Sequence, residues 1–187
     1  MSGGRSTIAA IEAEYGRYKA YGESAFSQLT GAELNAQANP EANSIAMIVW
    51  HLSGNLASRF TDFLTADGEK SWRNREEEFA HRAVSKPACL AKWEAGWKVL
   101  TDALVALTDA DLERVVQIRQ RPLTVRDALL RSLAHASYHV GQIVYVAKVL
   151  RGSGWSYLTI PPGQSDAYNR DPRLDNPDAH ASGITGR

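Results

Sequence analysis

The chain has 187 residues, of which 44% are hydrophobic, and its 21 basic residues equal its 21 acidic residues in number. This length and composition fit one globular domain with a hydrophobic core and exclude wholesale disorder. The formal net charge of zero gives no electrostatic reason to bind nucleic acid or an anionic membrane, and the apolar runs, such as AMIVW, are far shorter than the roughly 20 residues of a membrane span.

Two helices are predicted in the first part of the chain. Over residues 7–29, apolar residues recur every three or four positions from Ile8 to Leu29, which is helical periodicity. The second predicted helix runs from Ser44, a good N-cap residue, to about residue 64. Residues 67–85 are polar with scattered aromatics, and we expect a long connection there, packed over one end of the helices.

Two more helices are predicted in the second part, separated by a short hairpin. The third helix begins near Ser85, with Pro87 in its first turn. The stretch VVQIRQRPLTV predicts a short hairpin, because β-branched residues flank a central break. The fourth helix begins at Thr124, in a capping-box pattern, and runs to about Arg151, where glycines end it.

Four long amphipathic helices with little strand predict an all-α fold, an antiparallel four-helix bundle with long connections. We expect residues 1–187 to form a single domain. The proline-rich end shows no helical period, so residues 166–187 are expected to form a mobile tail.

The fourth helix places histidines on its inward face. A stripe from Val125 to Val149 faces the core in this interpretation, and it contains His135, His139 and Gln142. Side chains four residues apart are neighbours on a helix, so two imidazoles at this spacing can bind one metal ion.

The second helix carries a matching polar line of His51, Asn55 and Arg59. Burying such groups unpaired would cost a few kcal/mol each, so they need partners. Three neutral imidazoles suit Zn²⁺, Ni²⁺ or Fe²⁺, and three protein ligands leave a position for water or substrate. The alternative is that the histidines are structural and bond only to neighbouring groups.

Other residues with reactive side chains fit the pattern less well. His81 and His180 are expected at the surface, and Glu78 in NREEEF is expected in a solvated run, although it could reach the metal if the connection folds over the site. Cys89 lies near a helix N-terminus, but a small core residue explains it better than a nucleophile does. The single cysteine, together with the absence of an apolar signal core in MSGGRS, predicts the cytoplasm.

His51 on the second helix together with HASYHVGQI on the fourth resembles the DinB-like superfamily. The stretch WHLSGNLASRFTDFLTADGEKSWRNREEEF further resembles an uncharacterised bacterial subgroup of it. The resemblance covers roughly residues 5–165 and implies a bundle with up-down-down-up connections, in which His51, His135 and His139 bind a divalent metal. It also implies thiol-dependent S-transferase or related hydrolase chemistry with a low-molecular-weight thiol such as bacillithiol or mycothiol. Val140 stands where many relatives carry arginine, so the resemblance does not identify the thiol.

Asn55 and Gln142 are the candidates for orienting the histidines or positioning a substrate, with ordinary polar packing as the alternative. Three functions stay open: a metal-dependent enzyme acting on a small molecule, a non-catalytic metal-binding or stress-associated interaction protein, and a bundle with structural histidines. We also expect a homodimer, because aromatic residues outnumber what one narrow helix seam needs and because relatives often dimerise. No nucleic-acid or membrane partner is expected.

Overall fold

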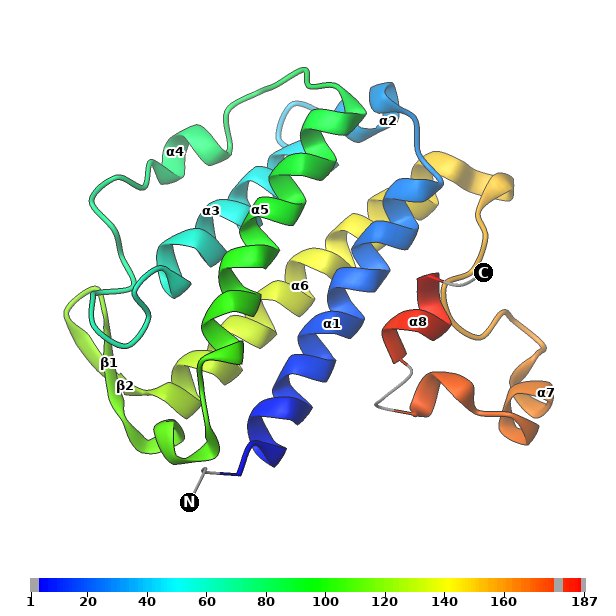
Figure 1. The fold of residues 1–187 in the computed structure, drawn as a ribbon. Coiled ribbons are helices and arrows are strands. Elements are labelled where there is room, and N and C mark those ends of the chain that lie inside the picture. Colours follow the sequence, from blue (N-terminus) through cyan, green and yellow to red (C-terminus); the bar gives the residue numbers. More distant parts are fainter. Residues whose placement is uncertain (1–3, 177–179, 186–187) are drawn as a thin grey trace.

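The structure, a computed structural model, describes residues 4–176 and 180–185 and is mostly helical. Figure 1 shows four long helices side by side, α1 (Ser6–Ser27), α3 (Ile45–Phe60), α5 (Lys86–Val105) and α6 (Val125–Arg151). Four shorter helices are α2 (Gly31–Asn35), α4 (Arg75–Glu78), α7 (Ser165–Arg170) and α8 (His180–Thr185), and short 3-10 helices occupy Asp109–Glu113, Gly152–Gly154 and Arg173–Asp175. The prediction of a helical fold is confirmed.

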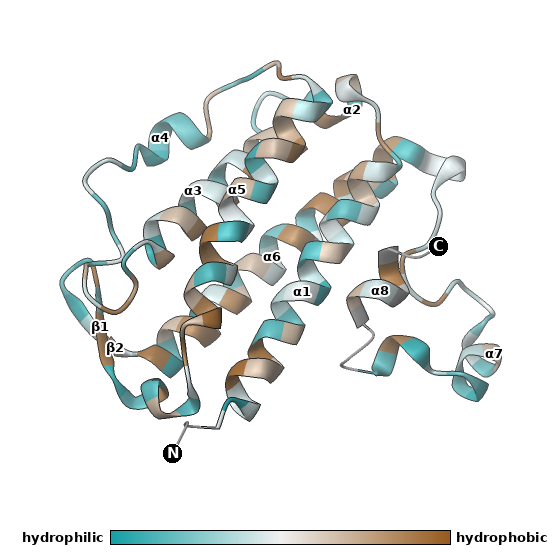
Figure 2. Cartoon of the chain, viewed as in Figure 1, coloured by the Kyte–Doolittle hydropathy of each residue, from teal (hydrophilic) through white to brown (hydrophobic). Residues whose placement is uncertain are grey.

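The polar connection between α3 and α5 determines how the site is covered. Figure 1 shows α3 and α5 running in the same direction, so the chain must return along the length of α3 before α5 begins. The hydrophilic helix α4 lies on this return segment and packs against α3 (Figure 2). The expectation that residues 67–85 cover one end of the helices was therefore wrong, because a connection between two parallel helices has to span their length.

The helix starts follow the capping residues of the sequence. The side-chain oxygens of Ser44, Ser85 and Thr124 each accept a hydrogen bond from the backbone N–H three residues later, at 3.2, 3.3 and 3.0 Å. The end of α3 differs from the prediction, since the helix stops at Phe60 rather than near residue 64. Asp62 has a φ of 49°, which no right-handed helix accommodates.

The predicted hairpin is confirmed as two antiparallel strands, β1 (Val115–Ile118) and β2 (Arg121–Thr124). Its two turn residues, Arg119 and Gln120, have φ values of 55° and 60°, as a tight two-residue hairpin turn requires. The carboxylate of Asp67 accepts hydrogen bonds from both turn N–H groups, at 2.8 and 2.7 Å. These bonds tie the hairpin to the segment that follows α3 and bring Arg119 to that end of the helix.

The core lies between the long helices and includes large aromatic side chains. Trp93 and Trp97 of α5 are buried, and the ring of Trp93 meets Phe26 edge-on with centroids 5.0 Å apart. Gly96 lets α5 approach α3 closely, because a Cβ there would lie 2.6 Å from the Cα of Ser53. The side chains of Trp93, Trp97 and Phe26 belong to one continuous hydrophobic core cluster.

Helix α6 has 27 residues and α3 has only 16, so α6 extends beyond α3. The predicted inward stripe is therefore wrong at its end, where Val149 is 61% exposed. No helix of residues 4–176 and 180–185 is long and apolar enough to cross a membrane.

The C-terminal segment contains short helices that the sequence pattern did not predict. Leu174 and Ile184 are buried against Ala20 of α1. The side chain of His180 lies outside the described part of the chain, so its predicted surface position is not addressed. Mobility of residues 166–187 and a single domain over residues 1–187 remain predictions.

Candidate metal centre

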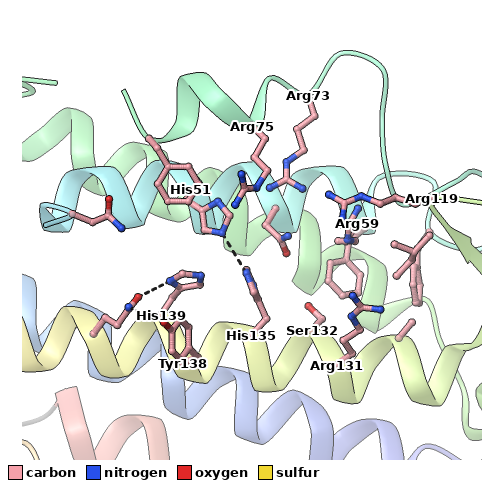
Figure 3. A pocket seen from close by; sticks show the side chains of 18 residues that line it. His51, Arg59, Arg73, Arg75, Arg119, Arg131, Ser132, His135, Tyr138 and His139 are labelled. Carbon is pink, nitrogen blue, oxygen red and sulfur yellow. Dashed lines mark hydrogen bonds between the residues drawn. The ribbon is translucent and has the colours of Figure 1, made fainter. Parts of the chain in front are cut away.

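The two inward-facing helices bring three histidines together. His51 lies in the middle of α3 and faces His135 and His139 on α6 (Figure 3). Their ring centroids are 4.5 to 5.3 Å apart, and one nitrogen from each ring belongs to a set whose members all lie within 4.8 Å of one another. His51 and His139 are buried, at 4% and 8% exposure.

One pair of nitrogens in this cluster has the separation expected of two ligands on one ion. The Nε2 atoms of His51 and His135 are 3.3 Å apart. Two nitrogens bound to zinc at roughly 2.0–2.1 Å in a tetrahedral arrangement would be roughly 3.3–3.4 Å apart. The donor set therefore fits a divalent metal such as zinc.

Glu78 fixes the orientation of the His51 ring. Its Oε2 lies 2.9 Å from Nδ1 of His51, and its two oxygens accept from Nε and Nη2 of Arg73 at 2.8 and 2.9 Å. Burial would raise the pKa of Glu78, but the hydrogen bonds from His51 and Arg73 outweigh it and hold the pKa below its ordinary value. An ionised carboxylate only accepts, so Nδ1 of His51 donates to it, and in the neutral ring Nε2 then carries the lone pair.

Gln142 plays the corresponding part for His139. Its Oε1 lies 2.8 Å from Nδ1 of His139, while its amide nitrogen donates to the hydroxyl of Tyr138 at 3.2 Å. The assigned amide orientation thus makes Nδ1 of His139 the donor and leaves Nε2 with a lone pair. Gln142, one of the two residues predicted to orient the histidines, makes that contact.

His135 has no such partner. Its Nδ1 is buried and forms no hydrogen bond within the described residues. Burial first, and then the neighbouring His139 and His51, lower the pKa of His135 to about 3. Burial likewise lowers the pKa of His139. Both rings are thus held in the neutral form, which is the form that binds a metal.

These proton positions bear on the choice between a metal site and structural histidines. His51 and His139 both use Nδ1–H on an oxygen acceptor, so in the neutral rings of these two residues Nε2 carries a lone pair. A proton on Nε2 of His135 can be donated to only one of the neighbouring lone pairs. A metal cation, by contrast, attracts each of them. The arrangement favours a metal over purely structural histidines.

The cluster opens onto a pocket of about 430 Å³, large enough for a small molecule. Asn55, the other predicted positioning residue, lines this pocket at 9% exposure but forms no hydrogen bond to the three histidines in the described structure. Arg59, which completes the polar line of α3, also faces the pocket. These two side chains therefore face the space for a ligand rather than the rings.

Glu78 lies elsewhere than the sequence pattern predicted. It was expected in a solvated run, but it is 6% exposed and reaches the outer side of His51 rather than the ligand cluster. The glycine at position 54 of α3 is a sequence feature consistent with this close approach, since a Cβ on Gly54 would overlap the Glu78 carboxyl group. His81 is exposed and Cys89 is buried in the core, where burial raises its thiol pKa to about 11. Neither residue lies in the cluster.

Comparisons with known proteins give a family and a fold but no activity. The family model described as a protein of unknown function, DUF1572, matches residues 3–164. The crystal structure of a conserved protein from Enterococcus faecalis is similar, with a TM-score of 0.58 and 21% sequence identity over 79% of this chain and 98% of that chain. At this identity, the likeness concerns the fold alone. No functionally curated protein matches the chain.

Proposed function

The chain belongs to the DUF1572 family of proteins of unknown function, and on this premise we propose that it is a divalent-metal-dependent enzyme with a DinB-like bundle. The observation that carries the proposal is the cluster of three histidines, each offering one ligand nitrogen within 4.8 Å of the others, at the end of an open pocket. A pocket beside three ligands leaves room for an exchangeable ligand, as catalytic metal sites require. Zinc, nickel and iron all suit imidazole ligands.

The residues around the cluster have separable roles in this proposal. His51, His135 and His139 would hold the metal, and Glu78 and Gln142 keep two of the rings in the tautomer that presents Nε2. Phe79 lies against the His51 ring with centroids 4.5 Å apart and limits its rotation. A bound divalent cation would favour the deprotonated form of a thiol or water at neutral pH.

We assign the reaction as thiol-dependent S-transfer, or a related hydrolysis, on the strength of the resemblance to the DinB-like superfamily. In S-transfer, the thiol sulfur forms a bond to an electrophilic carbon, and the leaving group departs with the electron pair of the bond that breaks. The thiol proton passes to solvent. The pocket volume of about 430 Å³ suits a low-molecular-weight thiol or a small electrophile.

The test is turnover by the metal-loaded chain with bacillithiol, mycothiol, glutathione or cysteine as the thiol and monobromobimane or 1-chloro-2,4-dinitrobenzene as the electrophile. We expect at least one pair to react faster than the uncatalysed rate, with the gain lost in His135→Ala and kept in His81→Ala. Equal turnover by a metal-free His135→Ala protein would contradict the mechanism. Bound metal without turnover of any pair would contradict the enzyme and support a non-catalytic metal-binding protein.

A homodimer and a cytoplasmic location also remain proposals. Sedimentation at micromolar concentrations tests the dimer, and a single species at the 20.5 kDa chain mass would contradict it.

A further inference from the structure

The pocket beside the histidines is lined by an unusual number of cationic side chains. Its lining includes five arginines, Arg59, Arg73, Arg75, Arg119 and Arg131. Figure 3 shows His51 and His139 at one end of the pocket and three of the arginines, from α3, α6 and the hairpin turn, at the other. A chain with zero formal charge thus concentrates positive charge in the recess beside the three histidines.

The two helices that supply the histidines also supply arginines, at the same spacing from a histidine on each helix. On α3, Arg59 follows His51 by eight residues, and on α6, Arg131 precedes His139 by eight residues. Because Figure 3 shows the two helices running in opposite directions, both lines end with histidine on one side and arginine on the other. Eight residues of helix span roughly 12 Å, and four residues span roughly 6 Å. The pocket therefore has two chemically distinct ends separated by about the length of a small organic molecule.

The carboxylates near these arginines do not neutralise them all. Glu69 pairs with Arg59 and Arg119 at 3.1 and 2.9 Å, while Glu78 pairs with Arg73. Glu76 pairs with Arg75 but is 90% exposed. These three carboxylates thus form ion pairs with four of the five guanidinium groups. No carboxylate lines the pocket within the described part of the chain.

Two of the guanidinium groups keep donors free for a ligand. Arg59 has a side chain that is only 13% exposed, and its Nη1 bonds to Gly68 O and Glu69. Its Nε and Nη2 form no hydrogen bond to other residues of the described structure. Burial lowers the pKa of Arg59, which marks an incompletely compensated charge. Arg131 lines the pocket at an exposed position and has no ion pair among the described residues.

We propose that the Arg59–Arg131 end of the pocket binds the oxyanion of a small organic acid, a carboxylate or a phosphate ester. Planar guanidinium groups match both anions with paired hydrogen bonds. Phe60, Phe63 and Ile118 line the same recess and offer apolar contacts for the carbon skeleton. The ligand class is therefore an organic anion with an apolar body, its acid group held by the arginines.

The direction in which this ligand lies rests on the proposed function. With its anion at Arg59 and Arg131, the far end of a ligand roughly 6–12 Å long reaches the histidines, where its thiol or electrophilic group would react. The anion subsite itself does not depend on a metal, because its donors belong to the arginines alone.

The test is isothermal titration of the full-length chain, once in chelator and once loaded with zinc. The probes are 4-phenylbutyrate, phenyl phosphate and the uncharged amide of 4-phenylbutyrate. The variants are Arg131→Gln, at an exposed position, and Arg59→Lys, which retains the charge but loses the planar fork. Arg126→Gln is the matched control, since Arg126 is also exposed on α6 but pairs with Glu113 outside the pocket.

We expect at least one anion to bind in chelator, more weakly as salt increases, with about tenfold or greater loss of affinity in Arg131→Gln and Arg59→Lys and no loss in Arg126→Gln. A preference for the butyrate or for the phosphate identifies which acid the subsite favours. Equal affinity for the amide, unchanged affinity in Arg131→Gln, or no binding of either anion would overturn the subsite. Anion binding by a chain that takes up no zinc, nickel or iron would overturn the proposed metal function and leave the subsite standing.

Discussion

Substituting Glu78 by glutamine tests how the proposed metal centre is supported. The carboxylate accepts hydrogen bonds from Nδ1 of His51 at 2.9 Å and from Nε and Nη2 of Arg73, whose side chain is only 2% exposed. In Glu78→Gln, the amide retains one acceptor oxygen but loses the charge, so His51 loses a charged acceptor and Arg73 loses its buried counter-ion. Replacing such a partner of a metal-binding histidine lowers metal affinity by roughly 10- to 100-fold.

The same substitution affects stability through two separate routes. If the dissociation constant for the metal rises 10- to 100-fold, about 1.4–2.7 kcal/mol of metal-dependent stabilisation is lost when metal is in excess. The metal-free protein also loses stability, because breaking a buried ion pair costs up to roughly 3–5 kcal/mol, and glutamine keeps part of the hydrogen bonding. We therefore expect Glu78→Gln to be less stable in chelator and to gain less from added zinc than the wild type does.

The assay is competition for zinc with a chromophoric chelator, with circular dichroism to establish that each variant is folded. Glu77→Gln is the matched control, since Glu77 is exposed and neighbours Glu78 on the same short helix. A folded Glu78→Gln protein that binds zinc as tightly as wild type would refute the role assigned to the carboxylate.

Three further predictions concern acid, glycine packing and the cysteine. His135 has a folded-state pKa of about 3, below its ordinary value of roughly 6.5. The metal-free protein should therefore lose stability as pH falls from about 6.5 toward 3, by at most about 1.4 kcal/mol per pH unit and less because the ring is partly exposed. Urea titrations in chelator should show that the free energy of unfolding depends less steeply on pH in His135→Asn, and equal slopes in the two proteins would contradict this. In Gly54→Ala the new Cβ displaces Glu78, so zinc affinity should fall. Gly141→Ala, with open space around its Cβ, should keep its zinc affinity and gain up to about 1 kcal/mol of stability. Equal zinc affinity in the two variants would count against the packing argument. Cys89→Ser should lose stability, because it buries a hydroxyl group, yet retain its metal content and any turnover; loss of turnover with metal retained would instead indicate cysteine catalysis.

Local patterns in the sequence predicted that the three histidines would come together. The four-residue spacing of His135 and His139, and the position of His51 in an apolar run, were enough to expect all three on inward faces. The structure brings them together because α3 and α6 pack against each other. Gln142 was also accessible, since three residues from His139 on a helix is within hydrogen-bonding reach.

The supporting and charged parts of the site depend on the path of long connections. Glu78 is 27 residues from His51, in a segment whose composition resembles a solvated surface, and only the return of the chain along α3 buries it. The pocket arginines come from α3, the connection, the hairpin turn and α6, so no periodicity links them. Arg119 reaches the pocket end because Asp67 ties the hairpin turn to the connection, which only the tertiary structure shows.

Metal content of the untagged full-length chain tests the central claim most directly. Elemental analysis should be carried out on wild type, His139→Ala and, as a control, His81→Ala, whose histidine is exposed and outside the cluster. We expect about one divalent ion per chain in wild type and His81→Ala and little in His139→Ala. Equal metal content in wild type and His139→Ala, or a wild-type chain that takes up no zinc, nickel or iron, would contradict the account.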